Sequence, residues 1–90
     1  MSIVEHELEN SIEAKTKHSN HIVLFNDEHN DFVFVIACLI KYCKHNPQQA
    51  EQCALITHNN GKCSIKRGTI SDLISINQAL IDCGLTSEIQ

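Results

Sequence analysis

The chain has 90 residues and a formal net charge of −4 at neutral pH, and it contains no Trp. This length allows one domain with a modest core, and an acidic chain poor in aromatic residues is not expected to bind nucleic acid. No apolar run approaches the length needed to span a bilayer, so we expect a cytoplasmic protein without a membrane partner.

Residues 1–19 and residues 20–90 differ in composition. The first stretch is polar and charged with sparse apolar residues, which predicts a flexible tail because too little apolar surface is available to offset the entropy of ordering. The remainder alternates between regular apolar patterns and turn residues. It is expected to form a single folded domain.

The folded part begins with a predicted strand, a turn and a helix. Residues 22–25 form a continuous apolar run of β-forming residues, which suits a central strand. Residues 26–30 have turn chemistry, and Asn30 or Asp31 can cap the helix that follows. That helix carries two apolar stripes between residues 32 and 43, so we expect it to be broadly buried.

The rest of the chain predicts two more helices and two more strands. Asn46 and Pro47 open a helix that Gly61 ends, and residues 62–67 alternate as in a half-exposed strand. A third helix follows Gly68, and residues 85–90 form a last short strand. The order β-α-α-β-α-β predicts an α+β fold, a small two-layer sandwich of a three-stranded sheet and three helices.

The five cysteines are Cys38, Cys43, Cys53, Cys63 and Cys83. Three fall at apolar helix positions, where a thiol acts as a small hydrophobic group, so we expect reduced cysteines. Zinc ligation by Cys43 with His45, or by His58 with Cys63, is the alternative. The chain has no Cys-x-x-Cys motif, and we therefore expect no metal site.

Polar residues that follow the first strand and end the second helix suggest a binding site. Asn26, Asp27 and Glu28 come directly after the strand, and His58 lies in the last turn of the helix. An amide, carboxylates and a neutral imidazole are hydrogen-bond acceptors without a fixed positive charge. Beside apolar residues, they suit a protein N-terminus that begins with a large apolar residue.

Several segments together resemble the Clp protease adaptor family, ClpS. The residues that carry this resemblance are Leu24-Phe25-Asn26-Asp27-Glu28, Phe32, Phe34-Val35-Ile36, Thr57-His58 and Gly61-Lys62. The resemblance covers roughly residues 20–90. It implies a non-catalytic adaptor, without a cofactor, that binds N-degrons and delivers their bearers to a Clp-family AAA+ unfoldase. It also implies that the tail of residues 1–19 engages the unfoldase, whereas composition alone is equally compatible with a frayed terminus.

The resemblance also implies roles for individual residues. Those expected at the α-amino group are Asn26, Asp27, Glu28 and His58, and those expected in the hydrophobic pocket are Phe25, Asn30, Phe32, Val35, Ala54 and Leu85. Strand alternation favours Glu28 over Asp27 as the closer carboxylate. The expected ligands begin with Phe, Tyr, Trp or Leu. Since many family members carry Met at the Phe32 position and a larger aliphatic residue at the Ala54 position, we expect a preference shifted toward aromatic residues.

Two other functions compete with the adaptor hypothesis. An enzyme is disfavoured because no nucleophile lies near His58 in sequence and no glycine-rich phosphate loop is present. The stronger alternative is an interaction module of the same fold that binds an internal motif or serves as a structural subunit. Of these hypotheses, only the adaptor hypothesis requires that the ligand has a free N-terminal amine.

Overall fold

The computed structural model describes residues 20–90, and the predicted tail of residues 1–19 lies outside this range. The elements in chain order are β1 (Asn20–Phe25), α2 (Phe32–Cys43), α3 (Pro47–Asn60), β2 (Lys62–Gly68), α4 (Ile70–Asp82) and β3 (Thr86–Ile89). The predicted α+β class and the order β-α-α-β-α-β are confirmed.

The sheet has the strand order β2-β1-β3, and both pairings are antiparallel. The apolar run of Ile22, Val23 and Leu24 lies in the central strand and is buried throughout. The register between β1 and β2 shifts at Ile22 and Val23, so β2 carries an extra residue at this point. Such a bulge bends its strand and redirects side chains. Lys66 is on the bulged strand.

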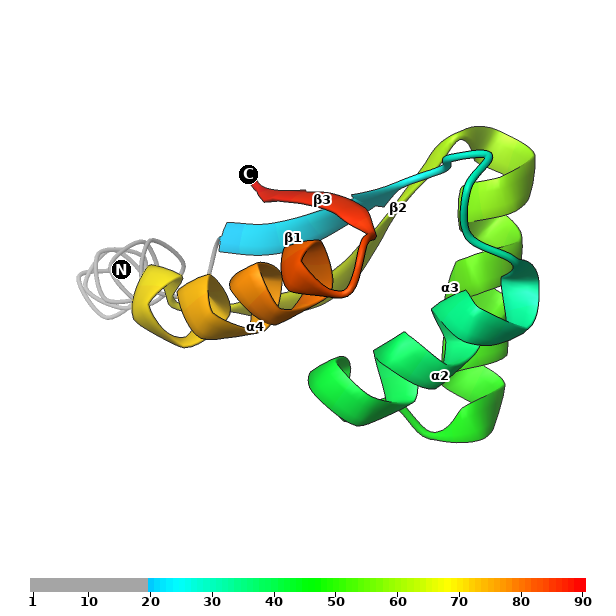
Figure 1. Ribbon diagram of the computed structural model, residues 1–90. Helices are drawn as coiled ribbons and strands as arrows, with labels where there is room; N and C mark the ends of the chain where they lie inside the picture. Colours follow the sequence, from blue (N-terminus) through cyan, green and yellow to red (C-terminus); the bar gives the residue numbers. More distant parts are fainter. Residues whose placement is uncertain (1–19) are drawn as a thin grey trace, which may run out of the picture.

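The helices cover the sheet in two groups. Figure 1 shows α4 running along the strands, while α2 and α3 form a pair toward the end of the sheet where β1 stops. Helix α2 packs against α3 and α4, and α3 packs against β2. The core joins all of these elements, and its largest fully buried side chains are Ile22, Leu24, Leu39, Leu73, Leu80 and Cys43.

The predicted helix boundaries are confirmed by their caps. Asp31 accepts a hydrogen bond from the backbone N–H of Phe34, and Asn46 accepts one from Gln49. Each cap satisfies one N–H that has no partner inside the helix. Gly61 ends α3 in the left-handed conformation, with φ of 92°. A Cβ would be strained at this backbone angle, which explains the glycine.

The prediction that α2 is broadly buried is wrong for its first turn. Its buried residues are Cys38, Leu39 and Cys43, whereas Phe32 and Phe34 keep 38% and 40% of their surface exposed. The apolar pattern is there, but Phe32 borders an open cavity, and Phe34 is exposed outside the lining of that cavity. An exposed aromatic residue beside a cavity is a feature of ligand-binding surfaces.

All five cysteines are free, as expected. Cys38 and Cys43 are buried, and the other three are partly buried. Burial raises the pKa of Cys43 to about 11, and burial together with the neighbouring Cys83 thiol raises the pKa of Cys38 to about 12. Within residues 20–90, no group of three His, Cys, Asp or Glu side chains is arranged to hold a metal ion. Among those same residues, no helix is long and apolar enough to cross a membrane.

Candidate functional site: a pocket beside Ala54

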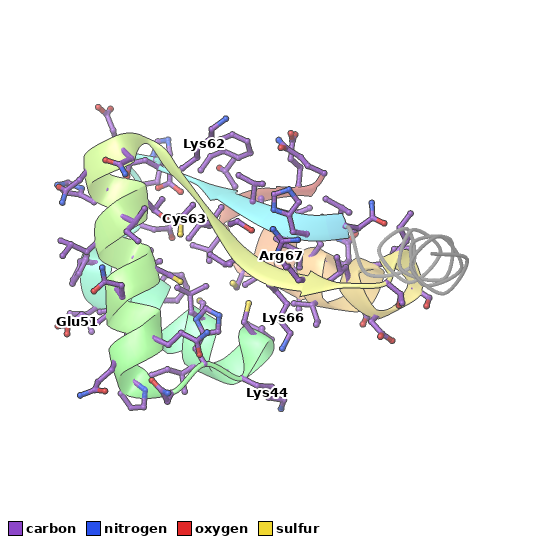
Figure 2. All side chains as sticks on the ribbon, turned by 180° about the vertical axis from the view of Figure 1, so that it is seen from behind. Lys44, Glu51, Lys62, Cys63, Lys66 and Arg67 are labelled. Atoms are coloured by element: carbon purple, nitrogen blue, oxygen red, sulfur yellow. The ribbon has the colours of Figure 1, made fainter. Side chains whose placement is uncertain are left out.

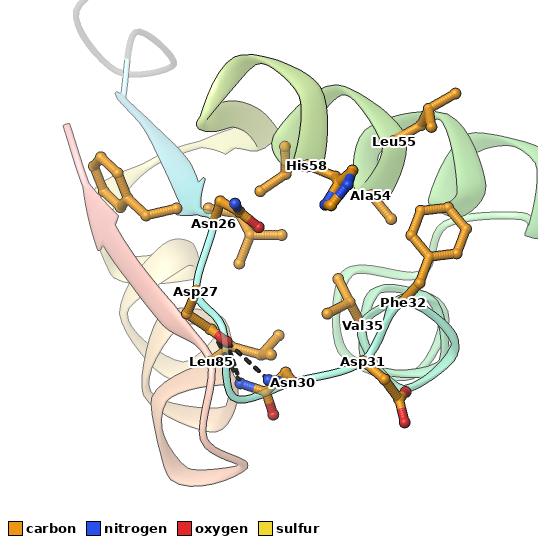
Figure 3. Close-up of a pocket in the computed structure, with 13 residues that line it drawn as sticks. Asn26, Asp27, Asn30, Asp31, Phe32, Val35, Ala54, Leu55, His58 and Leu85 are labelled. Carbon is orange, nitrogen blue, oxygen red and sulfur yellow. Dashed lines mark hydrogen bonds between the residues drawn. The ribbon is translucent and has the colours of Figure 1, made fainter.

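A cavity of about 400 Å³ opens where β1 ends, between the start of α2 and the second half of α3. Figure 3 shows the two helices and the segment after β1 surrounding it. Its lining residues, named here the Ala54 pocket, are Leu24, Phe25, Asn26, Asp27, Asn30, Asp31, Phe32, Val35, Ala54, Leu55, Thr57, His58 and Leu85. A concave, largely apolar site with a few polar groups is the usual form of a small-ligand site.

One backbone hydrogen bond brings the polar residues of two distant segments together. The N–H of Asn26 donates to the carbonyl of Gly61 at 2.9 Å, which joins the end of β1 to the end of α3. His58 is therefore held near Asn26. His58 also follows Ala54 by one helical turn, so both project from one side of α3. In Figure 3 the His58 imidazole and the Asn26 amide face the same opening, and Ala54 lies beside His58 on α3.

Asp27 stabilises the turn between β1 and α2, and this turn forms one wall of the Ala54 pocket. Its Oδ1 accepts hydrogen bonds from the backbone N–H groups of His29 and Asn30, at 2.8 and 2.9 Å. The Asn30 amide donates to both carboxylate oxygens of Asp27, and also to the carbonyl of Gly84 at 2.9 Å. This link fixes the turn against the residue that precedes Leu85. The turn and one apolar wall of the pocket are therefore held by a single side chain, Asn30.

The same hydrogen bonds keep the Asp27 carboxyl group ionised. Burial alone would raise the pKa of this carboxyl, but the hydrogen bonds from Asn30 and from the His29 backbone outweigh burial and lower the pKa below its ordinary value. The carboxyl is thus ionised at neutral pH. Oδ1 already accepts three donors, whereas Oδ2 accepts one from Asn30. Since a carboxylate has about four acceptor positions, Oδ2 has room for a further donor.

The apolar part of the Ala54 pocket comes from several segments, including Leu24 and Phe25 at the end of β1. Phe32 and Val35 come from the first turn of α2, Ala54 from α3, and Leu85 from the segment before β3. Ala54 and Leu85 are buried at 3% and 4% exposure, so they form the floor, while the more exposed Phe32 borders the mouth. Of the lining residues, all within 20–90, none is Lys or Arg. The pocket can therefore accept a cation attached to an apolar group.

The structure brings together nine of the ten predicted site residues. Those in the lining are Asn26, Asp27, His58, Phe25, Asn30, Phe32, Val35, Ala54 and Leu85. Glu28 is exposed and does not line the cavity. The alternation that favoured it over Asp27 does not apply, because β1 ends at Phe25 and the chain then turns. Of the two carboxylates, Asp27 therefore lines the pocket and Glu28 does not.

Four lining residues were missed by the sequence prediction: Leu24, Asp31, Leu55 and Thr57. Thr57 follows Ala54 at a spacing of three residues, a helical neighbour position that could have found it. Asp31 had been assigned to helix capping alone. Leu55 is 43% exposed, and its apolar side chain extends the rim of the pocket beside α3.

These features define a small binding protein whose pocket has acceptors on one side and an apolar floor. The profile of one protein family, described as ATP-dependent Clp protease adaptor protein ClpS, matches residues 15–82. The chain belongs to the ClpS family. Members of this family are non-catalytic adaptors that bind N-degron substrates for a Clp unfoldase and protease.

Comparison with solved structures gives the same fold. The chain is similar to Agrobacterium tumefaciens ClpS2 bound to L-phenylalaninamide, with a TM-score of 0.74 and 15% sequence identity. The alignment covers 83% of this chain and 96% of that one. Among curated protein sequences, none matches the chain.

Proposed function

We propose that the Ala54 pocket binds the first residue of N-degron substrates, reading the free α-ammonium group and the side chain together. The observation that carries the proposal is the arrangement of Asn26, Asp27 and His58 on one side of a pocket whose floor is Ala54 and Leu85. The related ClpS2, with the same fold, was solved with L-phenylalaninamide, a ligand with a free amine and an aromatic side chain. This supports a similar ligand for the present chain.

The ammonium group is bound by three acceptors in this proposal. Oδ2 of Asp27 accepts one N–H, and its carboxylate balances the positive charge. The side-chain amide oxygen of Asn26 and the neutral His58 imidazole accept the other N–H groups. Glu28, exposed beside the turn, contributes only long-range attraction. Charge-assisted hydrogen bonds contribute about 1.5–3 kcal/mol each before the entropy of binding is subtracted. A blocked amine loses both the charge and donors.

The side chain of the ligand's first residue is recognised through its burial in the Ala54 pocket. Phe25, Phe32, Val35, Ala54 and Leu85 offer apolar contacts, and burying a Leu or Phe side chain contributes about 1.5–3 kcal/mol. The small Ala54 leaves depth for a ring, and Phe32 offers an aromatic face. We therefore propose ligands that begin with Phe, Tyr, Trp or Leu, with the aromatic residues preferred.

Two further parts of the sequence prediction belong to this proposal. A Clp AAA+ unfoldase in the cytoplasm receives the captured substrate, and residues 1–19 take part in delivery. The competing function is recognition of an internal motif. Such binding does not require a free amine on the ligand, and this difference can be measured.

A pair of histidine variants tests the proposal. His58→Ala removes an acceptor from the pocket, and we expect the affinity for a Phe-initiated peptide to fall about tenfold, since one such hydrogen bond is lost. His29→Ala is the matched control, because His29 is exposed, lies outside the pocket lining and forms its hydrogen bond to Asp27 through its backbone N–H. Fluorescence polarisation with a labelled peptide measures both. Equal affinity of the two variants would exclude His58 from the site.

A further inference from the structure

Two of the five cysteines lie in direct contact although they come from opposite ends of the folded part. Cys38 is on α2, and Cys83 is the residue at which α4 ends. Their Sγ atoms are 3.3 Å apart, while 45 residues separate them in the chain. Neither thiol is among the residues that line the Ala54 pocket. The binding site therefore leaves this pair without a role.

The hydrogen bonds of the two thiols show how they are oriented. Cys83 Sγ lies 3.2 Å from the carbonyl oxygen of Leu80, and because a carbonyl only accepts, the Cys83 S–H donates to it. The Cys38 S–H is then the donor in the contact between the two sulfurs. The sulfur of Cys38 thus points directly at the sulfur of Cys83, with no other group between them.

The two thiols differ in their access to solvent. Cys38 is 4% exposed, and burial together with the neighbouring Cys83 thiol raises its pKa to about 12. Cys83 is only partly buried, and Asp82 and Gly84 on either side of it are exposed. Since thiol oxidation requires contact with the oxidant, Cys83 is the first of the two to react, and Cys38 is the second thiol held beside it.

The distance between the two sulfurs is short enough for a bond to form. A disulfide has a sulfur–sulfur distance of about 2.05 Å, so the two atoms have to approach by roughly 1.3 Å. The chain can adjust beside Cys83, because the next residue is Gly84 at φ of 100°, where the chain leaves α4. Helices α2 and α4 already pack against each other. The pair therefore needs no rearrangement of the fold.

We propose that Cys38 and Cys83 form a reversible disulfide when the folded chain meets hydrogen peroxide. The Cys83 sulfur attacks one peroxide oxygen: an S–O bond forms, the O–O bond breaks, and the leaving oxygen takes up the Cys83 proton and departs as water. The Cys38 sulfur then attacks the Cys83 sulfenic acid: the S–S bond forms, the S–O bond breaks, and the departing hydroxide takes the Cys38 proton. Two thiols and one peroxide give one disulfide and two waters, and a dithiol reductant reverses the change.

The disulfide joins two segments that carry walls of the Ala54 pocket. Val35 lies one helical turn before Cys38 on α2, and Leu85 follows Cys83 by two residues. In the reduced chain, the hydrogen bond from Asn30 to the carbonyl of Gly84 connects the same part of the molecule. Oxidation adds a covalent bond there and stabilises the folded state. The disulfide forms whether or not the pocket binds N-degrons, so either claim can be tested without the other.

Cys53 and Cys63 are a second pair of neighbouring thiols and the main alternative site of oxidation. Figure 2 shows Cys63 on β2 beside α3, the helix that carries Cys53. Burial and the Cys63 thiol raise the pKa of Cys53 to about 12. Cys63 Sγ, however, donates to the carbonyl of Ser64 in its own strand. The sulfur–sulfur contact of 3.3 Å favours Cys38 and Cys83 over this pair.

Trypsin separates all five cysteines, which allows every pairing to be identified. Cleavage after Lys and Arg places each cysteine in its own peptide, with Cys38 in residues 18–41 and Cys83 in residues 68–90. After treatment of the native full chain with hydrogen peroxide, mass spectrometry should show the loss of two hydrogens and a link between these two peptides. The melting temperature should rise by about 10 °C or more, because the link closes a loop across 45 residues of the unfolded chain. Dithiothreitol should reverse both changes.

Three variants distinguish the roles of the two thiols. Cys38→Ala leaves Cys83 without a second thiol, so peroxide should produce a sulfenic acid at Cys83 that dimedone labels. Cys83→Ala should leave Cys38 unlabelled. Cys63→Ala is the matched control, since Cys63 is also partly buried but lies outside the pair, and this variant should form the disulfide as the unaltered chain does.

Four results would overturn the proposal. They are an unchanged mass after peroxide treatment, a disulfide between Cys53 and Cys63 in place of the expected one, an unchanged melting temperature of the oxidised chain, and dimedone labelling at Cys38 but not at Cys83.

Discussion

Asp27→Asn tests the turn that supports the Ala54 pocket. An Asn at this position keeps an oxygen for the N–H groups of His29 and Asn30, but it replaces the Oδ2 acceptor, now 3.0 Å from the Asn30 amide, by a second donor. One charge-assisted hydrogen bond is lost. Such a bond contributes about 1.5–3 kcal/mol, and partial exposure of the turn reduces this, so we expect the free energy of unfolding to fall by about 1–2 kcal/mol.

The pH dependence of this effect has a definite sign. The hydrogen bonds lower the pKa of Asp27 in the folded state, so the unfolded chain binds more protons as the pH falls. The stabilisation from ionised Asp27 is therefore complete above the ordinary value of 3.8 and is lost as the pH falls through the lower folded-state pKa. The difference in stability between the unaltered chain and Asp27→Asn should accordingly narrow from about pH 7 to about pH 3.

Urea denaturation at both pH values measures these quantities, with Glu28→Gln as the control. Glu28 is the adjacent exposed carboxylate, and its substitution should change stability by less than about 0.5 kcal/mol. If Asp27→Asn and Glu28→Gln have the same stability at neutral pH, the turn does not depend on the Asp27 carboxylate and the reasoning is refuted.

Three further predictions concern the ligand and the core. Asn26→Ala should weaken binding of a Phe-initiated peptide about tenfold in isothermal titration, since it removes an acceptor from the ammonium group, and an unchanged affinity would remove Asn26 from the site. In competition binding, Phe-initiated peptides should bind more tightly than Leu-initiated ones, and peptides with a β-branched first residue should bind most weakly. Phe32→Met should narrow the difference in affinity between Phe and Leu, and Ala54→Met should weaken the binding of aromatic ligands most. Equal affinities for Phe and Leu would contradict this account of the pocket. Cys43, buried with its pKa raised to about 11, should resist iodoacetamide in the folded chain and react after denaturation, as mass spectrometry can follow; rapid labelling of the native protein would show that the core is open there.

Local sequence signals were sufficient for most of the fold. The apolar run of Ile22–Leu24 indicated a central strand, Asn46 with Pro47 indicated a helix start, and Gly61 indicated a helix end, because each signal acts through the backbone of its own segment. The spacing of Ala54 and His58 likewise placed both on one helix face, which the pocket confirms.

The sequence predictions were wrong where a residue's environment depends on contacts between distant segments. The apolar stripes of α2 indicated burial, but periodicity does not distinguish a side chain packed in the core from one bordering an open pocket, as Phe32 does. Alternation also failed at Glu28, since it holds only within a strand. The link from Asn30 to Gly84 joins residues far apart in sequence, and the orphaned Nδ1 of His45 depends on the turn that buries it. Neither contact has a local sequence signal.

The central claim is that the Ala54 pocket reads a free N-terminal amine beside a bulky side chain. Isothermal titration of two peptides, identical from the Phe at residue one onward and differing only in acetylation of the amine, tests it most directly. Acetylation deletes the charge that Asp27 balances together with hydrogen-bond donors, so the account predicts that affinity falls by about a hundredfold or more. Equal affinity for the free and the acetylated peptide would contradict it.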